Sequence, residues 1–146
     1  MIQLANKYNS FGDRVHYYLN NNDHLDIFGD DSYDFIYTTD VLQHIPQKHS
    51  LNYLTGLIRI LSPKGVLIFQ LPSENLNIIY RLLYSLGISN ALVNLYGKAR
   101  HIPIMEYHYV KLDYMKVFLK ENGADLIDTI NDRRSQVITY KYIVTK

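Results

Sequence analysis

A run of polar side chains follows the apolar sequence Phe35-Ile36-Tyr37. It brings two hydroxyls, a carboxylate, an amide and an imidazole close together in Thr38, Thr39, Asp40, Gln43 and His44. Polar groups that follow a buried strand lose hydration unless they form hydrogen bonds. The pattern therefore predicts a small-molecule site at the edge of a sheet.

His44 is the residue of this run whose ionisation could support catalysis. Imidazole titrates near neutral pH, so His44 could accept a proton from the hydroxyl or amine of an acceptor. Alternatively, it packs under the turn and orients the loop through hydrogen bonds to the backbone. Asp40, Thr38 and Thr39 have a similar structural alternative, because short polar side chains often cap turns and helices. Both interpretations stay open on the sequence alone.

A second group of polar and aromatic residues occurs later in the chain, at His101, Glu106, Tyr107, His108 and Tyr109. Its spacing fits no standard zinc signature, such as two histidines four residues apart with a nearby acid. The chain also has no cysteine, which excludes disulfides and thiolate metal sites. We therefore predict no metal site here and expect aromatic packing, either at the edge of the core or over a binding pocket.

Composition limits the classes of partner. The chain has 146 residues, enough for one domain, and a net charge of +1. Residues 13–40 contain seven acids and the single base Arg14, which argues against a groove for a phosphate backbone. No apolar run is long enough to span a bilayer. We expect a cytoplasmic protein that binds neither nucleic acid nor membranes.

Hydrophobic periodicity predicts alternating elements along a single domain. Helices are expected at residues 2–10, from Pro46 to a stop at 62–65, as a pair at 76–95 broken around Gly87, and at 114–121. Strands are expected at residues 15–19, 33–38, 66–69, 124–130 and 137–144. This alternation is typical of an α/β protein with a largely parallel sheet and one antiparallel strand at the end. Ligands of such sheets bind beyond the carboxyl ends of the strands, so residues 38–40 and 70–73 should share a rim.

Two sequence blocks carry a resemblance to a known family. The block "SYDFIYTTDVLQHIP" (residues 32–46) has an aromatic-Asp-x-Ile strand followed by a Leu-Gln-His-Ile turn, and "YLTGLIRILSPKGVLIFQLPS" (53–73) has an Arg-x-Leu-x-Pro-x-Gly helix ending and an apolar strand. They resemble the Rossmann-like methyltransferases that depend on S-adenosyl-L-methionine. Residues 104–146 resemble the last helix and strand pair of some bacterial members more weakly. The resemblance implies a mostly parallel Rossmann-like sheet with an antiparallel C-terminal strand.

The resemblance also implies roles for particular residues. Asn21, Asn22 and Asp23 occupy the place where the family contacts adenine, although the same residue types favour ordinary turns. Thr38 and Thr39 would lie along the methionine portion of the cofactor, and Gln43 and His44 match the turn that follows the strand. Residues 76–110 correspond to the region where acceptor-binding insertions are usual. The acceptor-side candidates within this region are His101, Tyr107 and His108.

The chain departs from the family at its amino end. Its seven glycines are at positions 12, 29, 56, 65, 87, 97 and 123, so no Gly-x-Gly turn for the cofactor is present. Met1 aligns best with the start of the family's second helix, and we expect the N-terminal strands of the fold to be missing. The strand at 33–38 would then have an unpaired edge, which proteins normally cover. The edge could be covered by rearrangement or by a homodimer, or the chain could be a truncated reading frame.

Two functions follow from these observations. The first is methyl transfer from S-adenosyl-L-methionine to a small-molecule acceptor, with the protein chiefly aligning the reacting atoms. The second is a non-catalytic remnant or interaction module that binds no cofactor. The sequence does not identify the acceptor.

Overall fold

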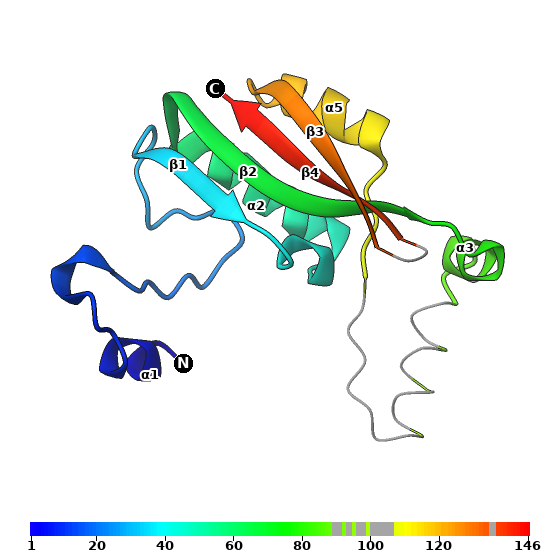
Figure 1. Cartoon of the computed structure of the whole chain (residues 1–146), viewed down its shortest axis with the longest axis horizontal. Coiled ribbons are helices and arrows are strands. Elements are labelled where there is room, and N and C mark those ends of the chain that lie inside the picture. Colours follow the sequence, from blue (N-terminus) through cyan, green and yellow to red (C-terminus); the bar gives the residue numbers. More distant parts are fainter. Residues whose placement is uncertain (89–91, 93–94, 96–98, 100–106, 135–136) are drawn as a thin grey trace.

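The computed structural model describes residues 1–88, 92, 95, 99, 107–134 and 137–146. Its described strands form a single sheet in the order β1-β2-β4-β3 (Figure 1). The strands are β1 (Tyr33–Thr38), β2 (Leu61–Asn75), β3 (Asp125–Arg134) and β4 (Val137–Thr145). β1 pairs with β2 in parallel, and β4 is antiparallel to both β2 and β3. Three strands therefore share one direction, which confirms the predicted mostly parallel sheet with an antiparallel C-terminal strand.

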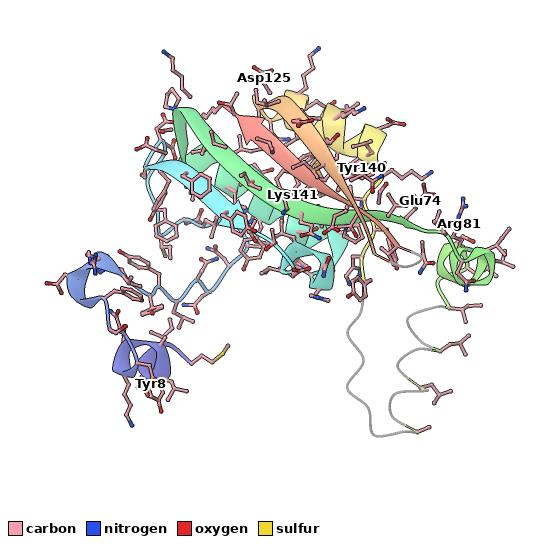
Figure 2. All side chains as sticks on the ribbon, in the orientation of Figure 1. Tyr8, Glu74, Arg81, Asp125, Tyr140 and Lys141 are labelled. Atoms are coloured by element: carbon pink, nitrogen blue, oxygen red, sulfur yellow. The ribbon has the colours of Figure 1, made fainter. Side chains whose placement is uncertain are left out.

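Helices α2 (Gln47–Ile60) and α5 (Leu112–Glu121) lie on the same side of the sheet (Figure 1). α3 (Ile78–Ser85) follows the end of β2, and α1 (Ile2–Lys7) lies apart from the sheet. Figure 2 shows Tyr8, which follows α1, away from the strands. No described helix is long and apolar enough to cross a membrane. The helices thus cover one face of the sheet.

The core lies between this face and the two helices. Alternate residues of β2 and β4 point into it, as expected for the period of a strand. The buried side chains of these strands and of α2 and α5 include Leu67, Phe69, Leu71, Tyr142, Val144, Leu54, Ile58, Met115 and Leu119. On β1, by contrast, Phe35 and Tyr37 are 60% and 56% exposed. The face opposite α2 and α5 is therefore apolar and accessible at β1.

Two expectations about elements need correction. Residues 15–19 form no strand, and no described strand pairs with the outer edge of β1. A strand needs a neighbouring strand, and local β-propensity does not supply one. Residues 62–65 fall within β2, where they bulge between the pairs Tyr33 with Leu61 and Phe35 with Val66. The helix therefore ends at Ile60 and the strand begins at once.

The predicted helix around 76–95 is partly described. α3 ends before Gly87, which has a φ of +70° that favours glycine. Leu92, Leu95 and Ala99 are helical, and the residues between them lie outside the described part of the chain. The assignment of residues 76–110 as an acceptor-side insertion stays a prediction.

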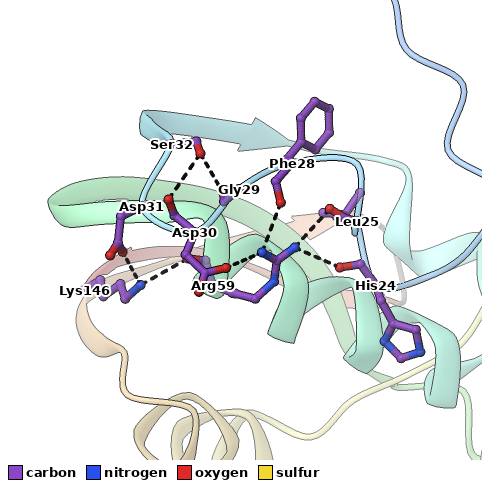
Figure 3. Close-up of polar contacts among 9 residues, drawn as sticks. All are labelled: His24, Leu25, Phe28, Gly29, Asp30, Asp31, Ser32, Arg59 and Lys146. Atoms are coloured by element: carbon purple, nitrogen blue, oxygen red, sulfur yellow. Dashed lines mark hydrogen bonds and ion pairs between the residues drawn. The ribbon is translucent and has the colours of Figure 1, made fainter.

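Arg59 attaches the segment before β1 to α2 (Figure 3). Its guanidinium donates hydrogen bonds to the carbonyls of His24, Leu25 and Phe28 and to the carboxylate of Asp30. Gly56, one turn earlier on α2, allows this segment to approach, because an added Cβ would lie 2.7 Å from the His24 carbonyl oxygen. Arg59 and Gly56 thus fix the chain that leads from the Asn21–Asp23 loop into β1.

Candidate functional site

A polar pocket of about 130 Å³ lies at the carboxyl ends of β1 and β2. Its lining residues come from the turn after β1, from β2 and β4, and from the segment before α5. They are Asp40, Gln43, Gln70, Tyr107, Val137 and Thr139. Asp40 and Gln70 belong to the two rim segments that the sequence placed together. The pocket lies where open α/β sheets bind ligands.

The turn after β1 organises the pocket through Gln43. This residue is only 5% exposed, and its side-chain amide nitrogen lies 3.3 Å from the Asp40 carboxylate and 3.2 Å from His44 Nε2. Because an amide NH₂ only donates, His44 Nε2 acts as the acceptor in this contact. The His44 ring also meets the Tyr107 ring edge to face, with the centroids 5.0 Å apart. His44 therefore supports Gln43 and Tyr107 and is not among the lining residues.

Asp40 has a left-handed backbone conformation, with a φ of +57°. Few non-glycine residues adopt this conformation, although aspartate and asparagine tolerate it best. Backbone strain of this kind concentrates at functional sites. The conformation turns the chain from β1 into the Leu42–His44 turn and brings Gln43 under the rim.

The segment from Tyr107 to Leu112 crosses the rim and joins the two predicted groups of residues. The backbone N–H of His108 donates to the Gln43 carbonyl at 2.9 Å, and that of Val110 donates to the Pro72 carbonyl at 2.9 Å. The N–H of Leu112 donates to Ser73 Oγ at 3.3 Å. These bonds hold Tyr107 over the pocket. His108 is half-buried beside it.

Sequence reasoning placed Gln70 on the rim without giving it a role, and it did not single out Thr139. Both line the pocket and are 3% and 5% exposed. Neither side chain forms a hydrogen bond to another described residue. The signal for Gln70 was local, because it directly follows the apolar run Val66 to Phe69. Thr139 gave no such signal. It reaches the pocket only because β4 pairs with β2, which places Thr139 opposite Pro72.

The Asn21–Asp23 loop lies against α2, and its residues do not line the pocket. The Asp23 carboxylate accepts hydrogen bonds from His49 at 2.6 Å and Asn52 at 2.8 Å, and it lies 3.2 Å from His24 Nε2. The bonds from His49 and Asn52 lower the pKa of Asp23 to about 2. Asn22 is bonded to Asp26 and to the His24 backbone. Asn21 and Asn22 are exposed, and Asp23 is half-buried.

The other predicted residues are less informative. Thr38 and Thr39 are half-buried at the end of β1, and Thr39 Oγ1 lies 3.5 Å from the Tyr37 hydroxyl. His101 lies outside the described residues. Among those that are described, no three histidine, aspartate or glutamate side chains come together as metal ligands.

The residues present fit an adenosyl cofactor only in part. Thr38 and Thr39 are polar and half-buried at the end of β1, and Asn21 is polar and exposed. Asp23, however, uses its carboxylate within the loop, and the sequence holds no Gly-x-Gly turn for close backbone contact. The assignment of these residues to a cofactor site therefore stays a prediction.

Comparison with known proteins identifies the class of this domain. A family model described as a methyltransferase domain matches residues 6–129. The chain belongs to this family, which confirms the resemblance found in residues 32–73. Among curated protein sequences, none matches the chain.

Solved structures establish the same Rossmann-like fold. A SAM-dependent methyltransferase from Methanosarcina mazei is 13% identical with a TM-score of 0.63, and the match covers 99% of this chain and 74% of that one. A 1,6-didemethyltoxoflavin-N1-methyltransferase from Burkholderia thailandensis, with bound S-adenosylhomocysteine, is 14% identical with a TM-score of 0.61, covering 99% and 55%. The magnesium protoporphyrin IX methyltransferase from Synechocystis, with the same bound molecule, is 16% identical with a TM-score of 0.52, covering 81% and 45%. The chain thus spans about half to three quarters of these proteins.

Proposed function

We propose that this chain forms the acceptor-side wall of a methyl-transfer site that uses S-adenosylmethionine and a small-molecule acceptor. The carrying observation is the polar pocket at the carboxyl ends of β1 and β2 in a methyltransferase domain. The cofactor supplies an activated methyl group on a sulfonium. The protein residues bind the acceptor and orient it toward that group, which is the main contribution that positioning can make to a displacement.

The roles of the pocket residues follow from their contacts. Gln43 and Gln70 offer amide donors and acceptors, and Tyr107 covers the acceptor from the rim segment. The bond from the Gln43 amide to His44 Nε2 supports a positioning role for His44, because a general base needs that nitrogen free to take a proton. Proton removal by His44 would require this bond to break first.

A non-catalytic module is the alternative function. It is favoured by the internal use of the Asp23 carboxylate and by the absence of a Gly-x-Gly turn from the sequence. Such a module would keep the sheet and the pocket without binding the cofactor.

Isothermal titration calorimetry of the chain with S-adenosylmethionine and S-adenosylhomocysteine separates the two functions. Dissociation constants in the micromolar range are expected if the domain serves methyl transfer. An absence of binding heat at high protein concentration would favour the non-catalytic module. Adenosine serves as the control for binding through the nucleoside alone.

A further inference from the structure

We propose that the N-terminal arm of one chain, residues 1–11, packs on the open face of the sheet in a second copy, over Phe35 and Tyr37. The open face is the one opposite α2 and α5. Each arm would reach the other copy, so the contact is reciprocal around a two-fold axis. The inference concerns a surface other than the polar pocket and does not depend on the proposed function.

The arm is apolar and exposed. α1 has six residues, and none of them is buried. Met1, Leu4, Tyr8 and Phe11 are each more than half exposed, and Lys7 is the one charged side chain among residues 1–11. Helices shorter than about 12 residues are marginal in water unless an apolar face packs on something. The arm therefore needs a surface that α1 does not find in its own chain.

One side of α1 forms an apolar groove of about 350 Å³. Its lining residues are Met1, Ile2, Leu4, Ala5 and Tyr8. An engineered protein cavity of about 150 Å³ holds one benzene molecule, so the groove has room for about two aromatic rings. Gln3 and Asn6 lie on the opposite side of the helix, as expected from about 3.6 residues per turn. The apolar side of the arm is thus shaped to receive aromatic side chains from another surface.

Phe35 and Tyr37 supply two such rings on the open face. They stack with their planes 20° apart and their centroids 6.5 Å apart, and both are more than half exposed. Val66 and Ile68 pair with them on β2, so the apolar surface continues across the neighbouring strand. Exposed contiguous apolar patches mark sites of protein interaction. The two rings on the sheet match the room in the groove.

The position of the arm favours the sheet of a second copy over its own. Figure 1 shows α1 beyond the outer edge of β1, on the side away from β2. The chain that leads from the arm back to β1 is attached to α2, where Tyr53 donates to the Asn22 carbonyl and Arg59 to the Leu25 carbonyl. This attachment keeps the segment on the α2 side of the sheet, which is opposite the face that carries the two rings.

The total exposed area also fits a dimer. The chain exposes 9850 Å², whereas a folded monomer of 17.1 kDa is expected to expose about 7,800 Å². The excess is about 2,000 Å² by this relation. A stable protein interface removes about 800 Å² from each partner, so less than half of the excess is enough for one.

Disulfide cross-linking tests the contact, because the chain has no cysteine of its own. Leu4→Cys and Phe35→Cys chains of different mass are co-expressed and oxidised. A heterodisulfide between the two chains should form at least tenfold more readily than in the matched pair of Gln3→Cys with Phe35→Cys, since Gln3 lies opposite the groove. Equal yields in the two pairs, or no heterodisulfide, would overturn the inference.

A chain that carries both Leu4→Cys and Phe35→Cys distinguishes the two possible sheets. It should form dimers linked between chains. A monomer closed by an internal disulfide would show that the arm covers its own sheet, and this result would also overturn the inference.

Leu4→Glu measures the contribution of the arm without disturbing the core, because α1 has no buried residue. The dissociation constant of the dimer, from light scattering over a dilution series, should rise at least tenfold, since a charge would enter an apolar contact. Gln3→Glu is the matched control and should leave the constant unchanged, and both variants should keep the wild-type circular dichroism spectrum. An unchanged constant in Leu4→Glu would contradict the assignment, as would a monomeric wild type.

Discussion

At the scale of single residues, the core contains a buried hydroxyl that differs from the polar side chains of the pocket. The hydroxyl of Tyr142 lies in the core with no hydrogen-bond partner among the described residues, and its ring stacks on Phe69 with the centroids 4.7 Å apart. Burial, with a smaller contribution from Tyr140, raises the pKa of Tyr142. This phenol faces the core, not the pocket, so it adds a cost to folding without an evident ligand.

Removing that hydroxyl should therefore not lower the free energy of unfolding. Tyr142→Phe is expected to keep the free energy of unfolding or raise it by about 1 kcal/mol, because it removes a buried group without a partner. The raised pKa favours the neutral phenol in the fold, so the fold gains no stability from this titration below about pH 10 and loses stability above it, where the phenol of the unfolded chain ionises. Urea unfolding at neutral pH and at about pH 11 should show a smaller alkaline loss in Tyr142→Phe. Tyr8→Phe, at a 73% exposed position, is the control and should match the wild type.

At the scale of elements, the contact between the Asn21–Asp23 loop and α2 is electrostatic and depends on pH. The pKa of Asp23 is lowered to about 2, chiefly by the hydrogen bonds from His49 and Asn52. The stability that this carboxylate contributes is therefore present above about pH 4 and is lost as pH falls toward the lowered value. Loop docking should weaken in acid before the sheet does.

Asp23→Asn tests this contact. The variant should melt at a lower temperature than the wild type at pH 6, and the difference should shrink as the pH is lowered from about 4 to about 2. Circular dichroism melts across this range provide the measurement. Asp13→Asn, in an exposed position, should follow the wild-type curve. A constant difference at every pH would show that the ionised carboxylate is not the cause.

The success of sequence reasoning also differs among elements. β1 and the turn after it could be predicted, because an apolar strand followed by clustered polar residues is a local pattern. Residues 15–19 have the composition of a strand but no neighbour to pair with, which no local pattern reveals. Gln70 and Thr139 meet only because β2 pairs with β4, a register set between segments far apart in the chain. The place of Gln70 on the rim was therefore predictable, whereas the place of Thr139 in the pocket was not.

At the scale of the whole molecule, the outer edge of β1 is the feature that most needs a partner. No described strand pairs with it, and Phe35 and Tyr37 beside it stack with their ring centroids 6.5 Å apart. We propose that a second copy of the chain pairs with this edge around a two-fold axis. Such an arrangement would satisfy the free backbone groups and bring the exposed rings of both copies together.

Size-exclusion chromatography with light scattering tests the dimer. The wild type should elute as a dimer at micromolar concentration, and Phe35→Lys should be monomeric because two like charges would meet near the axis. Ile127→Lys, at a 64% exposed position on β3 at the other edge of the sheet, should stay dimeric. A monomeric wild type would refute the proposal, as would a Phe35→Lys variant that still dimerises.

The rim segment that begins at Tyr107 has a consequence for how such a domain could change its acceptor. Its backbone N–H groups donate hydrogen bonds to the carbonyls of Gln43 and Pro72, and neither bond involves a side chain of the segment. Most substitutions in this segment would leave these backbone hydrogen bonds in place. The side chains of the segment could therefore change while the rest of the pocket kept its shape. Acceptor preference and fold stability would then be free to evolve separately.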